Sequence, residues 1–158
     1  MRKKIINTDI NTQPLTEDQT WLDLEQLAQV ELTSEDKAHP VESALITHDG
    51  TGWRAQHPGK QTIRLRFDTP LKISTIQLLF QESEQERTQE FLLSWSTDGG
   101  VSMSEIVRQQ YNFSQPTNTR EFEEYNVELN GVTLLELSII PNISGGETRA
   151  SLAQLRLA

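Results

Sequence analysis

The sequence predicts an all-β protein, an antiparallel β-sandwich of the jelly-roll type. Short stretches alternate apolar and polar residues with a period of two, which is typical of strands that bury one face. Turn sequences separate these stretches, among them Asp-Gly-Gly at 98–100 and Asn-Gly at 130–131, where glycine accepts a positive φ. No segment carries a convincing long helical pattern. Many short strands joined by turns are typical of sandwiches and jelly rolls.

The first part of the chain is the least regular. Residues 21–24 and 28–34 alternate like strands, although the first of these regions also allows a helical turn. Residues 39–55 are too polar for a buried strand and contain the turn sequence Asp-Gly-Thr-Gly followed by a tryptophan. Loops of this length usually have a role, so we expect a structured corner of the sandwich here.

The later strands are clearer. Residues 61–67 alternate isoleucine, leucine and phenylalanine with threonine and arginine, and residues 68–70 are expected to end this strand. A charged loop is expected at 82–90, because four glutamates and an arginine occur there. Further strands are expected at 73–80, 91–97, 105–110, 121–129, 132–140 and 150–157.

Composition narrows the classes of ligand. The 158 residues suffice for one domain with a proper core. With 14 Lys and Arg against 23 Asp and Glu, the net charge of −9 argues against nucleic acid and against an anionic membrane surface as partners. The charge tolerates a neutral or cationic ligand. The absence of cysteine excludes thiol nucleophiles, disulfides and thiolate metal sites.

The chain divides into two parts. Residues 1–19 are polar and are expected to be a flexible N-terminal segment, and residues 20–158 are expected to form one domain. The basic start is followed by too few apolar residues for a signal peptide, and no run approaches the roughly 20 apolar residues of a membrane span. The expectation is a cytoplasmic protein, or a module of a larger one.

Several segments, in order, resemble discoidin domains. The matching segments are 28–35, 44–55 with its Asp-Gly turn and tryptophan, 61–70, 91–100 with its Asp-Gly-Gly turn, and 150–157. Discoidin domains are also called coagulation-factor type C domains, and related carbohydrate-binding modules are similar. The likeness covers about residues 26–158. It implies a galactose-binding-domain-like jelly roll that binds a ligand with loops at one end and does no chemistry.

The resemblance also suggests one cofactor. Many such modules carry a structural calcium ion near the Asp-Gly turn, with a further carboxylate in the last strand. Asp49 matches the turn, and Thr51 beside it is the second candidate ligand. The last-strand position is Gln154, whose neutral amide is a weaker calcium ligand than a carboxylate. Met103 stands where an aromatic residue often follows the second turn.

A carbohydrate site needs an aromatic plane surrounded by Arg, Asn or Gln, because sugars have apolar faces and a rim of hydroxyls. Residues 108–125 have this composition. The alternative is a strand pair whose aromatic residues point inward and whose arginines pair with nearby glutamates at 121, 123 or 124. The candidate ligand-binding residues are Arg108, Tyr111, Asn112, Phe113 and Arg120, with His48 and Arg54 as secondary candidates and Arg87 and Arg149 as further residues of a binding rim.

Other conspicuous residues are assigned to the framework. Trp53 could be a sugar platform, but we expect it to pack into one end of the sandwich, and we expect Trp95 in the core. Three histidines nine residues apart lack the spacing of a zinc site. The glutamates of 82–90 are expected to form a solvated loop rather than the paired carboxylates of a glycosidase.

The sequence therefore favours a non-enzymatic binding module, with carbohydrate as the leading ligand class. The alternative is a protein-interaction or structural domain on the same fold, because a fold alone does not determine function. A hydrolase would need a nucleophile–base set or a metal site, and the sequence contains no Gly-x-Ser-x-Gly, phosphate-loop or dinucleotide-binding motif.

Overall fold

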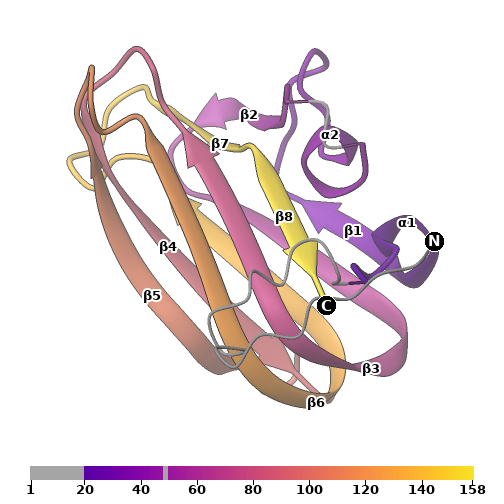
Figure 1. The fold of residues 1–158 in the computed structure, drawn as a ribbon. Coiled ribbons are helices and arrows are strands. Elements are labelled where there is room, and N and C mark those ends of the chain that lie inside the picture. Colours follow the sequence, from indigo (N-terminus) through magenta and orange to yellow (C-terminus); the bar gives the residue numbers. More distant parts are fainter. Residues whose placement is uncertain (1–19, 48–49) are drawn as a thin grey trace, which may run out of the picture.

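Two long strands, β3 (Gln61–Gln81) and β6 (Arg120–Ile140), run antiparallel through both layers of the molecule (Figure 1). The computed structural model describes residues 20–47 and 50–158. Both strands bend at the same place, where the pairing register shifts repeatedly between Arg66 and Thr75 and Gly131 has a φ of 68°. Strands that bend in this way pass from one layer of a sandwich to the other.

The remaining strands extend the two layers. In one layer, β5 (Ser104–Phe113) pairs with β4 (Arg87–Ser96), β4 pairs with the second half of β6, and β1 (Ala28–Leu32) pairs with the first half of β3. In the other layer, the second half of β3 lies between the first half of β6 and β8 (Gln154–Leu157). The predicted antiparallel β-sandwich is confirmed.

A two-stranded ribbon lies at one end of the sandwich, at the top of Figure 1. It consists of β2 (Trp53–Pro58) and β7 (Arg149–Leu152), and we call this end of the molecule the ribbon end. Two single-turn helices, α1 (Leu24–Leu27) and α2 (Glu42–Leu45), precede β1 and β2. Neither of these helices, the ones found in the described ranges, is long and apolar enough to cross a membrane.

Several expected strand boundaries are wrong, each for a physical reason. Residues 21–24 do not form a strand, because the carbonyl of Asp23 accepts the N–H groups of Gln26 and Leu27 and closes a helical turn. Residues 61–67 and 73–80 belong to one strand, as do 121–129 and 132–140, because β3 and β6 stay paired across their shared bend. The segment 150–157 is two strands that meet at Ala153.

The core lies between the two layers and includes aromatic contacts across them. The rings of Phe80 on β3 and Phe91 on β4 stack with centroids 5.3 Å apart. Trp53 is 1% exposed, and its indole N–H donates to the carbonyl of Ser34 over 3.0 Å, so its predicted packing into the sandwich is confirmed. Trp95 is half-buried and packs against the same core.

A chain of polar side chains, which we call the polar bridge, joins the layers along the edge between β5 and β6. Its first part is buried, and Arg87 is 4% exposed. The Arg87 guanidinium donates to Glu82 over 2.7 Å, to the carbonyl of Pro141 over 2.8 Å and to Gln89 Oε1 over 3.3 Å. The amide N–H of Gln89 then donates to Glu121 Oε1 over 3.2 Å.

The polar bridge continues on the other side of Glu121. Gln109 on β5 donates to the carboxylate of Glu123, and the Tyr125 hydroxyl donates to Gln109 Oε1. Glu121 is 2% exposed, and its Oε2 atom has no hydrogen-bond partner within the described part of the chain. Burial, and then the nearby Glu123 carboxylate, raise the pKa of Glu121 from 4.5 to about 8. A proton held between the two carboxyl groups therefore completes the bridge near neutral pH.

The free energy of unfolding is expected to fall as the pH rises from about 4.5 to about 8, since Glu121 binds its proton more tightly in the folded chain than in the unfolded chain. The slope from this group is at most about 1.4 kcal/mol per pH unit. The variant Glu121→Gln keeps the shape and cannot ionise, so urea unfolding at several pH values should show a shallower slope. If the slope were the same in both proteins, the Glu121 carboxyl group would not bind its proton more tightly in the folded chain than in the unfolded chain.

The loop before β2 lies against the connection between β7 and β8. Gly52 has a φ of 66°, and a Cβ atom at this position would lie 2.6 Å from the carbonyl oxygen of Leu152 and 2.9 Å from Cα of Ala153. Gly50, in the same loop, has a φ of 90° but no atom within 4 Å of such a Cβ. Gly52 thus permits a close approach of two backbones as well as a left-handed conformation.

Gly52→Ala is expected to lower the free energy of unfolding by about 2–4 kcal/mol, because the added methyl group meets backbone that cannot turn aside. Gly50→Ala is the matched control. Only backbone strain should lower the free energy of unfolding of this variant, by about 1–2 kcal/mol. Urea unfolding of both variants measures the difference. Equal losses would show that the loop moves away from Leu152 at little cost.

Candidate functional site

A hollow of about 100 Å³ lies at the ribbon end, where the loop before β2 meets the connection between β7 and β8. It combines a buried apolar base, to which Trp53 contributes, with a rim of polar side chains. The lining residues are His39, Gly50, Thr51, Trp53, Arg54, Gln81, Ser151, Leu152 and Ala153. Two of the predicted residues, Arg54 and Thr51, thus lie at the same hollow.

The alternation of β2 places Arg54 at the rim. Trp53 and Ala55 are buried, and Arg54 between them is exposed opposite Ser151 of β7. The backbone of Arg54 also holds the preceding loop, because its N–H donates to the carbonyl of His39 over 3.2 Å and its carbonyl accepts the N–H of Asp36 over 2.8 Å. The alternation of β2 and the anchored loop therefore fix the position from which the Arg54 side chain extends outward.

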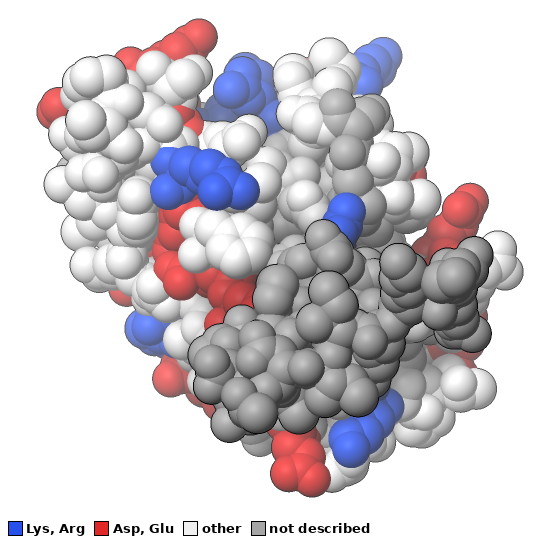
Figure 2. Space-filling model, in the orientation of Figure 1, with Lys and Arg blue, Asp and Glu red and all other residues white. Residues whose placement is uncertain are grey.

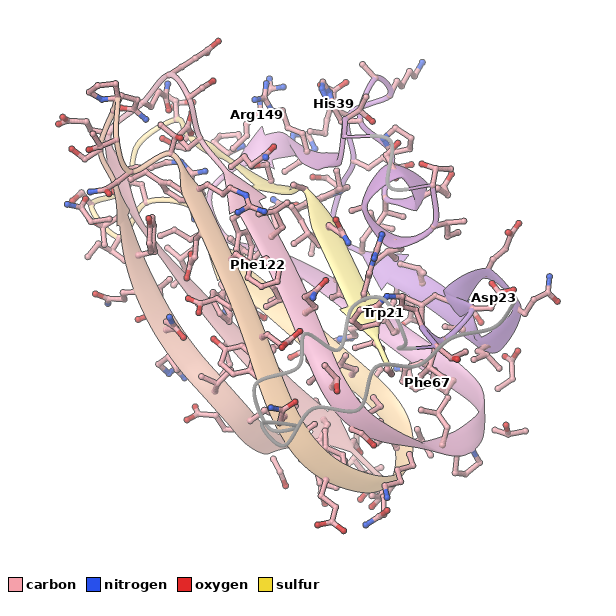
Figure 3. All side chains as sticks on the ribbon, in the orientation of Figure 1. Trp21, Asp23, His39, Phe67, Phe122 and Arg149 are labelled. Carbon is pink, nitrogen blue, oxygen red and sulfur yellow. The ribbon has the colours of Figure 1, made fainter. Side chains whose placement is uncertain are left out.

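His39, Asp36 and Arg149 stand close together at the same end, and Figure 3 shows His39 and Arg149 extending from it. His39 Nδ1 lies 3.7 Å from the Asp36 carboxylate, and this nitrogen is buried without a hydrogen-bond partner among the described residues. The N–H of Ala38 lowers the pKa of Asp36, and the charges of His39 and Arg149 lower it further. The ribbon end therefore holds the Arg149 guanidinium near the Asp36 carboxylate.

The structure separates the candidates of residues 108–125 rather than bringing them together. Arg108 and Asn112 point outward from β5, where Arg108 pairs with Glu90 over 3.3 Å and Asn112 accepts a hydrogen bond from Thr88. Arg120 lies on β6, with its guanidinium 5.6 Å from the centre of the exposed Phe122 ring. None of these three side chains lines the ribbon-end hollow.

The two aromatic candidates point inward. Phe113 is fully buried and meets Tyr111 edge to face, with ring centroids 4.9 Å apart. The Arg87 guanidinium lies 4.7 Å from the centre of the Phe113 ring, so Arg87 belongs to the core rather than to a binding rim. The Tyr111 hydroxyl donates to the carbonyl of Arg120 over 3.0 Å. The Tyr111 hydroxyl therefore helps to hold β5 and β6 together, and Phe113 packs under Arg87 of β4.

The remaining predicted residues lie either outside the described residues or at the ribbon end. His48 and Asp49 lie outside the described residues. Arg149, expected at a binding rim, is exposed on β7 at the ribbon end. Sequence reasoning missed Gln81 and Ser151, which reach the hollow from the ends of β3 and β7. No local signal marks them, because only the tertiary fold brings these strand ends to the loop.

A second hollow, of about 240 Å³, lies beside α1 and α2. Trp21, Arg156 and several apolar side chains line it, and Figure 3 shows Trp21 beside β8. The Arg156 guanidinium lies 5.5 Å from the centre of the Trp21 ring, so another side chain already occupies one face of that ring. Although this hollow is larger, the ribbon end gathers more polar groups from separate strands, so we take the ribbon end as the candidate site.

No protein-family model matches the chain, and no curated protein sequence matches it. Several solved structures are similar to the chain in fold. The family 32 carbohydrate-binding module of C. perfringens NanJ, in complex with galactose, aligns with a TM-score of 0.64 at 14% identity over 87% of this chain and 97% of that one. The family 32 module of AlyQ, in complex with 4,5-unsaturated mannuronic acid, gives 0.63 at 16% identity over 89% and 98%.

A pectin-binding module gives a TM-score of 0.62 at 17% identity over 84% of this chain and 90% of that one. Other similar structures include a module from a family 31 glycoside hydrolase and a family 29 fucosidase from Ruminococcus gnavus, of which the match covers 26%. At these identities the likeness concerns the fold. The chain therefore has the galactose-binding-like β-sandwich fold that these carbohydrate-binding modules share.

Proposed function

We propose that this domain is a non-enzymatic carbohydrate-binding module whose site is the hollow at the ribbon end. The observation that carries the proposal is the extent of the fold similarity, which covers 90–98% of three modules that bind galactose, pectin or 4,5-unsaturated mannuronic acid. A protein-interaction or structural domain on the same fold is the alternative.

The chemistry of the rim supports this proposal. A sugar presents several hydroxyl groups at once, and each needs a donor or an acceptor when water is removed from it. Arg54 can donate from several N–H groups, and Gln81 supplies both an amide N–H and a carbonyl oxygen. A hollow of about 100 Å³ suits one edge of a sugar ring, with the rest of the glycan lying across the ribbon.

A glycan array followed by calorimetry tests the function and the site together. Arg54→Ala is expected to weaken binding of the best glycan roughly tenfold, because a charge-assisted hydrogen bond is lost. Arg108→Ala is the matched control, since Arg108 is also exposed but lies on β5. If Arg108→Ala weakened binding and Arg54→Ala did not, the site would lie on β5 instead. Binding to no glycan, together with a stable protein partner, would contradict the carbohydrate function.

A structural calcium ion at Asp49 and Thr51 is a separate proposal, which rests on the resemblance to discoidin domains. Thr51 is exposed at the hollow, and in the described ranges no three His, Asp or Glu side chains are grouped to hold a metal ion. Added calcium is expected to raise the Tm, because an ion that binds only the folded chain stabilises it. A Tm that neither calcium nor a chelator changes would contradict the proposal of a bound calcium ion.

A further inference from the structure

The arginines of the described residues fall into two groups. Those of the first group have an ion partner or an aromatic ring to lie on. Four of them pair with carboxylates, namely Arg64 with Glu136, Arg66 with Glu31, Arg87 with Glu82 and Arg108 with Glu90 and Glu105. Arg120 and Arg156 lie over the rings of Phe122 and Trp21. Arg54 and Arg149 have neither kind of partner within the described part of the chain.

These two arginines occupy the same face of the ribbon. Arg54 pairs with Ser151 across the ribbon, and Arg149 lies two residues before Ser151 on the same strand, so both side chains point outward. Arg149 is near enough to Asp36 to lower the pKa of that carboxyl group. Figure 2 shows basic side chains at the upper middle and upper right edge of the molecule, and acidic side chains at its upper left.

The carboxylates of the adjoining loop are used for other contacts. Glu35 accepts the N–H of Val41 over 2.8 Å, and Asp36 accepts the N–H of Ala38 over 3.0 Å. These bonds hold the loop in shape, and among the described residues neither Arg54 nor Arg149 forms an ion pair. A chain with a net charge of −9 thus presents two exposed guanidinium groups, those of Arg54 and Arg149, at its candidate binding surface.

We propose that the ribbon end selects acidic glycans, in which a carboxylate or sulfate group of the sugar lies against Arg54 and Arg149. This inference rests on the proposed carbohydrate function and names the ligand class. Guanidinium groups bind such anions with paired, charge-assisted hydrogen bonds, which are stronger than bonds to a neutral hydroxyl. Because both arginines are exposed, the attraction should weaken as salt is added.

The test is an array of uronic-acid, sialic-acid and sulfated glycans, each printed beside its neutral methyl-ester or desulfated counterpart. The expected result is preference for the acidic member of a pair by roughly tenfold, lost at high salt. By calorimetry, Arg54→Gln and Arg149→Gln should each remove most of this preference. Arg64→Gln is the matched control, since Arg64 is exposed on β3 and pairs with Glu136.

The outcomes separate the two proposals. Equal binding of acidic and neutral members, unaffected by Arg54→Gln or Arg149→Gln, would overturn the selection of acidic glycans and leave the carbohydrate function standing. Loss of the preference in Arg64→Gln as well would also overturn it, because the charge effect would then be general. Binding to no glycan of any kind would overturn both. Thermal unfolding of each variant confirms that a loss of binding is not a loss of fold.

Discussion

The pairing of β3 with β6 is the contact on which the rest of the structure depends. Both strands cross from one layer to the other at a shared bend, so one continuous ladder of hydrogen bonds sets the angle between the layers. The other strands of the main sheet are added to this pair, with β1 and β8 on β3, β4 on β6, and β5 on β4. The same ladder positions the candidate site, because Gln81 ends β3 at the hollow and pairs there with Arg120.

The alternation of the sequence was enough to predict the fold class, because a period of two is a local property. It was not enough to find the long strands. Residues 68–70 look like a turn, and they stay within β3 only because β6 bends alongside them. The polar bridge was hidden for a similar reason, since a strand containing Glu121 and Glu123 reads as solvated. Its alternation is visible, but only the position of β5 determines that the glutamates face inward.

The candidate site shows the same limit. Arg54 and Thr51 were found from the segment that resembles discoidin domains, whereas Gln81 and Ser151 lie far along the chain on other strands. In residues 108–125, aromatic, arginine and asparagine side chains gave the composition of a sugar site. A strand with one buried face has that composition as well, and here Phe113 is buried while Arg108 and Asn112 point outward. Net charge is also a property of the whole chain, and it does not reveal where unpaired arginines stand.

The ribbon of β2 and β7 is not part of the main hydrogen-bonded sheet. Its outward positions, such as the exposed Arg54 and the half-buried Ser151, contribute little to the core, whereas its inward positions, such as Trp53 and Leu152, are buried. The molecule therefore separates the residues that must be kept for folding from those that are free to vary. Such a division lets the outer face of the ribbon change in small steps while the scaffold stays the same.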